Sequence, residues 1–142
     1  MDITCLEDSV FSGCDKLRKV SFQDGSKLEK IGKMCFSCSG ITGFRAPPGL
    51  REIGPDAFAN CKYLRRVELN EGLEELVVQK GKQYNKNRGQ VSYDGIFYGS
   101  GLEELILPST LRKINSNALD GCDNLKRIFV KDDCAISTKN YT

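Results

Sequence analysis

The sequence predicts an α/β solenoid, in which short strands and turns repeat along one axis around a continuous apolar core. The main observation is an apolar pattern of the form Phe-x-x-Cys-x-x-Leu-x-x-Val-x-Phe that returns every 22 to 25 residues. A second apolar cluster lies between these blocks and keeps the same phase. Such periods are typical of repeat architectures, in which each unit buries its apolar face only by stacking on its neighbours. With 142 residues, 39% of them hydrophobic, we expect a single domain spanning residues 1–142.

Each copy of the main pattern ends in a segment that alternates apolar and polar residues. In Val67-Glu68-Leu69 this alternation has the period of a strand with one buried face. Stacked in parallel, with one segment from each repeat, they predict one continuous main sheet of about five strands. The predicted main strands are residues 17–22, 41–46, 64–69, 102–107 and 125–130.

The second apolar cluster predicts a short second strand and a turn in each repeat. It occupies residues 28–32, 50–54, 73–76 and 111–115. Pro55 then begins a segment that we expect to form a single helical turn, because the first helical position needs no N–H. Gly32 and Gly54 are predicted to mark turns with positive φ.

Two stretches carry a resemblance to a known family. Residues 50–61 read LREIGPDAFANC, and residues 102–114 read LEELILPSTLRKI. These units resemble the BspA-like leucine-rich repeats of bacterial and protist proteins, over residues 3–134 apart from one insertion. The resemblance implies a right-handed, curved leucine-rich repeat superhelix, used for adhesion or protein recognition and usually without catalysis. The chain departs from the pattern where Asn115 replaces a glycine, Leu119 replaces a phenylalanine and Ser39 replaces a cysteine.

An irregular insertion at residues 77–96 interrupts the repeat. The interval from the second cluster to the next Phe is five residues elsewhere, whereas Leu76 and Phe97 are 21 residues apart. Insertions in repeat proteins map to loops, often on the binding face, so we expect either a partner-contacting loop or a solvated loop without a ligand. The candidate contact residues in the loop are Lys80, Lys82, Tyr84, Lys86 and Arg88.

The strand alternation also predicts a partner-binding surface on the exposed face of the main sheet. Repeat solenoids use such a face for binding. Ile106 and Phe129 are expected to be exposed neighbours, and arginine and aromatic residues are enriched in interface hot spots. The alternative is that single exposed apolar residues carry no function. The predicted contact residues are Arg45, Arg66, Glu68, Glu104, Ile106, Arg127 and Phe129.

Most of the seven cysteines are predicted to be structural. They tend to fall at equivalent repeat positions, which favours small buried side chains over an extensive disulfide framework. Cys35 and Cys38 form a lone Cys-x-x-Cys without the further ligands that a zinc site needs. Cys5 falls where other repeats place Lys or Glu, so we expect it to be the exposed, reactive thiol.

The chain shows no catalytic motif and contains no histidine, the commonest general base and metal ligand. We therefore predict no enzymatic activity, no metal site and no cofactor. The leading hypothesis is a non-catalytic protein-recognition or adhesion module with an unknown protein partner. The alternatives are a structural spacer in a longer repeat protein, or weak polyanion binding through the basic loop with Lys19, Arg45 and Arg66.

The net charge and the chain ends bear on partners and location. A net charge of +2 argues against nucleic acid or an anionic membrane as the partner, and no apolar run is long enough to span a membrane. No secretory signal is apparent at the start, and both ends fall in mid-repeat, so we expect a longer natural chain or self-association at the ends. The resemblance favours the cell surface or the extracellular space, whereas free cysteines favour the cytoplasm.

Overall fold

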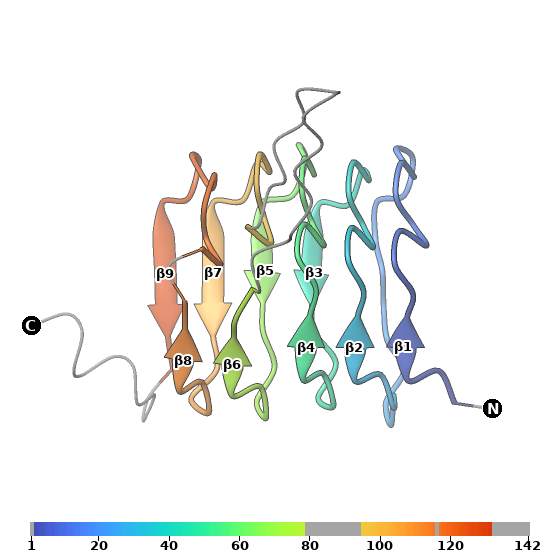
Figure 1. The fold of residues 1–142 in the computed structure, drawn as a ribbon, viewed down its shortest axis with the longest axis vertical. Coiled ribbons are helices and arrows are strands. Elements are labelled where there is room, and N and C mark those ends of the chain that lie inside the picture. The colour runs from blue at the N-terminus through green and yellow to red at the C-terminus, as the bar shows by residue number, and fades with distance from the viewer. Residues whose placement is uncertain (1, 79–94, 116, 132–142) are drawn as a thin grey trace, which may run out of the picture.

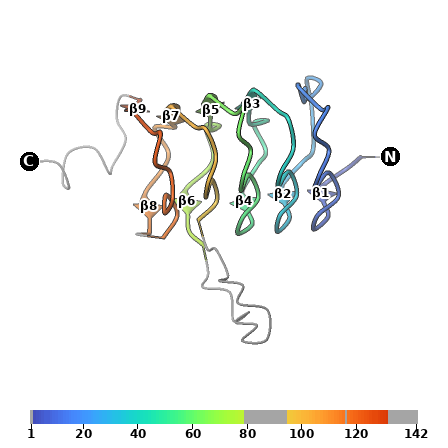
Figure 2. The ribbon, with the colours of Figure 1, turned by 90° about the horizontal axis from the view of Figure 1, so that it is seen from above.

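A computed structural model of the protein describes residues 2–78, 95–115 and 117–131, which coil around one axis (Figure 1). All the strand pairs are parallel. Figure 2 shows a main sheet along one side of the coils and short strands along the opposite side. The main sheet has the order β3 (Gly43–Arg45), β5 (Arg66–Glu68), β7 (Glu104–Leu107) and β9 (Arg127–Val130). The short strands are β1 (Cys5–Leu6), β2 (Lys30–Ile31) and β4 (Glu52–Ile53) in one sheet, and β6 (Glu75–Leu76) and β8 (Lys113–Ile114) in another. The predicted solenoid with a parallel main sheet is therefore confirmed.

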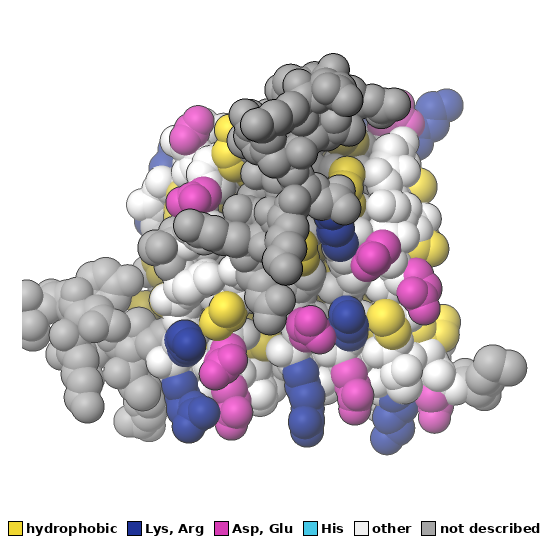
Figure 3. Space-filling model, in the orientation of Figure 1, with side chains coloured by type: hydrophobic (Ala, Val, Ile, Leu, Met, Phe, Trp, Pro, Cys, Tyr) yellow, Lys and Arg dark blue, Asp and Glu magenta, His cyan; other side chains and the backbone are white. Residues whose placement is uncertain are grey.

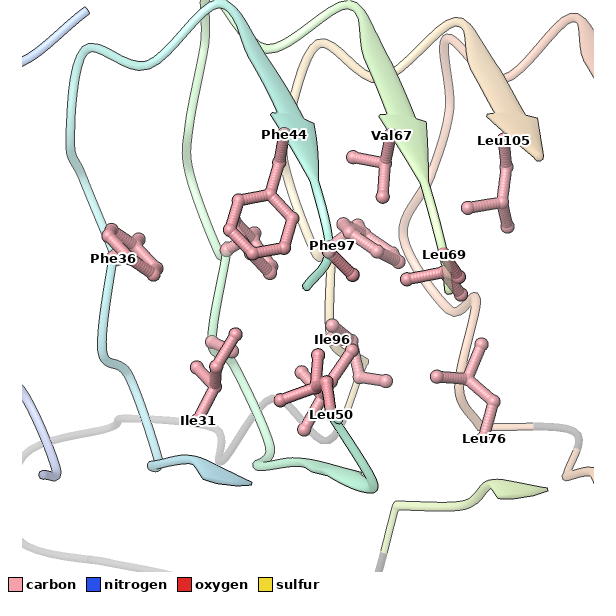
Figure 4. Close-up of a cluster of buried hydrophobic side chains, with 14 of the residues drawn as sticks. Ile31, Phe36, Phe44, Leu50, Val67, Leu69, Leu76, Ile96, Phe97 and Leu105 are labelled. Atoms are coloured by element: carbon pink, nitrogen blue, oxygen red, sulfur yellow. The ribbon is translucent and has the colours of Figure 1, made fainter. Parts of the chain in front are cut away.

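The register of the main sheet follows the sequence repeat. Phe44, Val67, Leu105 and Ile128 lie opposite one another on successive strands. Figure 4 shows the first three of these side chains pointing into the core. Because side chains alternate along a strand, the residues on either side of each point away from the core, to the outer face of the sheet.

Residues 17–22 differ from the prediction, since they form no strand. The amide of Thr42 donates to the carbonyl of Arg18 at 3.1 Å, but the described residues show no further bond that would extend this pairing into a ladder. This segment belongs to the first coil and packs on one side only, so its apolar residues Val20 and Phe22 remain half-buried. The main sheet of the described residues consequently begins at β3 rather than at residue 17.

Turns occupy the third side of each coil, where we expected a helical turn, and no helix occurs in the described part of the chain. In the second coil, the amides of Met34, Phe36 and Cys38 donate to carbonyls of the following coil at 2.8–3.0 Å. The intervening amides donate to the carbonyl three residues earlier and so close local four-residue turns. Positive φ at Met34 and Cys38 accommodates this alternation, and Asp56 and Asn60 repeat it in the third coil. Amides used between coils are lost to the helical i−4 pattern, which explains the absence of a helix.

Gly32 and Gly54 have a different role from the predicted one, since neither has positive φ. A Cβ atom on Gly54 would lie 2.7 Å from the backbone nitrogen of Lys33 in the preceding coil, and one on Gly32 would lie 2.7 Å from that of Asp8. Glycine is required here because two backbones approach closely.

The core contains a stack of phenylalanine rings from the repeated anchor position. The ring centroids of Phe11, Phe36, Phe58 and Phe97 are separated by 5.3–5.4 Å, and successive rings are close to parallel. Phe36, Phe58 and Phe97 are completely buried. The stack therefore joins one coil to the next through the centre of the molecule (Figure 4).

The repeat resumes in phase after the insertion. The amide of Phe58 donates to the carbonyl of Ile96 at 2.8 Å, and that of Asn60 donates to Tyr98 at 2.7 Å. The coils on either side of the insertion thus contact each other as other successive coils do. Within the described residues, no helix is long and apolar enough to cross a membrane.

Candidate functional site

The main sheet brings the predicted contact residues on its strands together in two rows. One row runs across the strands through Arg45, Glu68, Ile106 and Phe129, and the other through Arg66, Glu104 and Arg127. We use the term main-sheet face for the solvent-facing residues of these four strands, the residue before each strand, and the equivalent residues Arg18, Lys19 and Ser21 of the first coil.

Charged residues on this face form ion pairs between neighbouring strands. Arg45 lies 3.0 Å from Glu68, Arg66 lies 3.5 Å from Glu104, and Arg127 also pairs with Glu104. The arginine side chains remain more than half exposed, so each pair contributes at most about 1 kcal/mol to stability. These residues therefore support the sheet weakly and remain accessible to a partner.

A second charged row was not singled out from the sequence. Glu103 pairs with Arg65 at 3.1 Å and with Lys126 at 3.2 Å. These residues occupy one repeat position, directly before each strand, where the chain turns into the sheet. Their shared position in the repeat is the signal that could have identified them.

The prediction that Ile106 is exposed is wrong. Ile106 is 6% exposed, whereas Phe129 is 47% exposed. Ile106 lies on β7, which has a strand on each side and places Glu68 and Phe129 next to it, whereas Phe129 lies on the last strand of the sheet. Ile128, an inward-facing residue of the same last strand, is also exposed, at 41%. The exposed apolar pair is therefore Ile128 and Phe129.

The predicted loop contacts Lys80, Lys82, Tyr84, Lys86 and Arg88 lie outside the described residues. Their role as contacts stays a prediction.

The described cysteines range from buried to exposed. Cys35 and Cys61 are buried, and the Cys61 thiol donates to the carbonyl of Phe36 at 3.0 Å. Cys38 is exposed although Cys35 is buried, so the two thiols of the Cys-x-x-Cys do not face a common site. Cys5 is half-buried, whereas Cys14 is exposed, which makes Cys14 and Cys38 the more accessible thiols. Among the described residues, no three acidic or cysteine side chains cluster closely enough to hold a metal ion.

Burial changes the acidity of the buried thiols. It raises the pKa of Cys35 from 9.0 to about 11 and that of Cys61 in the same direction. Burial, with Asp123 and Asp120 nearby, also raises the pKa of Cys122 to about 11. These thiols hold their protons more tightly in the folded chain than in the unfolded one.

The free energy of unfolding is expected to fall as the pH rises from about 9 to about 11. The contribution of Cys35 is fully present below its unfolded pKa and is lost as the pH rises through its folded pKa, by about 2–3 kcal/mol. Urea unfolding at several pH values, in reducing buffer, measures this loss. In Cys35→Ala the decline should be shallower, and an identical pH dependence in both proteins would contradict the prediction.

The family model of the BspA-type leucine-rich repeat region matches residues 1–79 and 90–141, in six copies. The chain belongs to the BspA-type leucine-rich repeat family. This confirms the resemblance carried by residues 50–61 and 102–114.

Two solved leucine-rich repeat proteins have the same fold as this BspA-type chain. One, from Bacteroides ovatus ATCC 8483, is 25% identical with a TM-score of 0.70. The other, from Eubacterium ventriosum ATCC 27560, is 18% identical with a TM-score of 0.69. Each comparison covers 92% of the present chain and 30% of the solved one, so the chain spans about a third of their length. No curated protein matches this BspA-type chain.

Proposed function

We propose that this BspA-type leucine-rich repeat chain is a non-catalytic protein-recognition module that binds its partner through the main-sheet face. The observation that carries the proposal is the exposure of Phe129 beside Arg127 on the last strand of a regular parallel sheet. Aromatic and arginine side chains of this kind dominate the energy of many protein interfaces.

The surroundings of Phe129 suit reversible binding. The exposed ion pairs on the neighbouring strands contribute little to stability, so exchanging them for contacts with a partner costs little. Burying an exposed aromatic ring contributes favourably in the same contact. We also propose that the insertion at residues 77–96 forms a second contact with the partner. The module would serve adhesion at the cell surface, and we propose that the superhelix is right-handed.

A structural role is the alternative, in which the chain is a spacer between other repeats. The ion pairs across β3, β5, β7 and β9 favour this alternative, because they have a role within the sheet itself. The spacer requires no partner at Phe129, and this separates it from the recognition module.

The test is a pull-down that compares the wild-type chain with Phe129→Ser and with a control, Tyr63→Ser. Tyr63 is 57% exposed and is not itself a residue of the main-sheet face, although the Arg18 guanidinium of that face lies 5.4 Å from its ring centroid. Both variants therefore remove one exposed aromatic ring. We expect quantitative mass spectrometry to show a protein that the wild type and Tyr63→Ser retain and Phe129→Ser loses about tenfold or more.

Thermal unfolding shows that each variant is folded before it is compared. Equal retention by all three proteins would remove Phe129 from the binding site. A further chain lacking residues 79–93 assigns any remaining binding to the insertion, and no enrichment with any protein would favour the spacer.

A further inference from the structure

The main-sheet face has an excess of positive charge. Its basic residues outnumber its acidic residues by seven to three, a net charge of +4, whereas the whole chain has a net charge of +2. The basic residues are Arg18, Lys19, Arg45, Arg65, Arg66, Lys126 and Arg127, and the acidic residues are Glu68, Glu103 and Glu104.

The opposite side of the coils has no such excess. On the short strands and the residue before each of them, four basic and four acidic side chains are exposed, and Figure 3 shows the two kinds following one another along the lower edge of this side. These are Lys30, Arg51, Arg112 and Lys113 with Glu29, Glu52, Glu74 and Glu75. The charge asymmetry is therefore a property of the main-sheet face.

The ion pairs within the face do not remove its excess charge. Glu103 and Glu104 each lie between two basic side chains, and one carboxylate neutralises only one of the two. Lys19 pairs with no carboxylate in the described part of the chain, and the guanidinium of Arg18 donates to the backbone carbonyl of Asp15 instead. The excess charge is thus available to a partner.

Building on the proposed function, we propose that the partner of the main-sheet face is a protein surface or segment rich in Asp and Glu, with an apolar side chain against Phe129. Carboxylates approaching the face would form pairs with the basic side chains that the three glutamates leave uncompensated. Complementary charge would also accelerate association and make it dependent on salt.

An acidic protein fits this face better than a uniform polyanion such as nucleic acid or a sulfated polysaccharide. The glutamates lie between the basic side chains, so a continuous row of phosphates or sulfates would meet Glu103 and Glu104 as well. A protein can place its carboxylates separately and present an apolar group to Phe129.

The probe is a fluorescein-labelled peptide with five copies of Glu-Glu-Phe-Gly, compared with the same peptide carrying Lys for Glu. Fluorescence anisotropy measures the Kd of each at 50 and 300 mM salt. We expect only the acidic peptide to bind, with weaker binding at the higher salt concentration. Stronger binding of the basic peptide would overturn the proposal, as would failure of both peptides to bind.

The matched variants are Lys19→Gln with Arg45→Gln on the main-sheet face, and Lys30→Gln with Arg51→Gln on the short-strand side. Each double variant removes two positive charges, one of which is paired with a glutamate. We expect the first to raise the Kd for the acidic peptide about tenfold and the second less than about twofold. Equal effects would overturn the assignment to this face.

Heparin as competitor separates the acidic protein from a uniform polyanion. Tighter binding of heparin than of the acidic peptide, lost in the same face variant, would overturn the proposal in favour of a polyanion. Hydrogen exchange of the wild-type chain gives a measurement without variants, with protection by the acidic peptide expected in β3, β7 and β9. Capture of a Phe129-dependent partner without an acidic surface would reject this inference and leave the proposed function standing.

Discussion

Phe58→Ala is expected to lower the free energy of unfolding by about 3–5 kcal/mol, the largest effect of any single substitution considered. Phe58 is completely buried, and its ring lies between those of Phe36 and Phe97 at 5.3 and 5.4 Å. It also contacts the ring of Phe44, at 4.9 Å between centroids. Removing the ring leaves a cavity between coils and interrupts the stack on both sides.

Urea unfolding followed by circular dichroism measures this loss. Phe58→Leu is the control, because it keeps most of the apolar volume, and it should cost less than half as much as the alanine variant. A loss below about 1 kcal/mol for Phe58→Ala would show that the ring stack contributes little to the stability of the solenoid.

Gly54→Ala is expected to lower the free energy of unfolding by about 1–3 kcal/mol, because the added methyl group overpacks a rigid contact. Its Cβ would lie 2.7–3.0 Å from backbone atoms of Gly32 and Lys33, which cannot move without separating two coils. The matched control is Gly43→Ala, where the nearest atom would lie at an ordinary distance of 3.5 Å.

The unfolding midpoints of both variants in urea give the comparison. Gly43→Ala should remain within about 0.5 kcal/mol of the wild type. If the two glycine variants lost equal stability, the general flexibility of glycine would explain the result and the close approach at Gly54 would not.

The repeat period predicted the architecture because every coil contributes the same residues to the same core. The alternation around Val67 correctly placed its side chain inward, and the strand register followed from aligning one repeat on the next. The family resemblance rested on the same residues. The predicted short strands also appear at their expected places, at Ile31 and Ile53.

Features that depend on contacts between coils could not be predicted from one repeat. A glycine with positive φ in a turn and a glycine that allows a neighbouring backbone to approach look alike in sequence. The prediction of positive φ at Gly54 was therefore wrong. The alternation correctly placed the Ile106 side chain on the outer face of the sheet. It did not reveal that residues of the strands on both sides bury this side chain. The turns of the third side form because their amides bond to the next coil, which a local helical pattern does not reveal.

The turns on the third side of the coils form a row of aligned amides. Amides of Met34, Phe36 and Cys38 all point toward the following coil, and those of Phe58 and Asn60 do the same one coil later. The dipoles of these peptide units therefore add along the direction from β1 to β9 in Figure 1, with the positive end toward β9, much as dipoles add along a helix. Two copies meeting through identical ends would place carbonyl against carbonyl or amide against amide along this side. Along this side, the backbone thus distinguishes one end of the solenoid from the other, independently of any side chain.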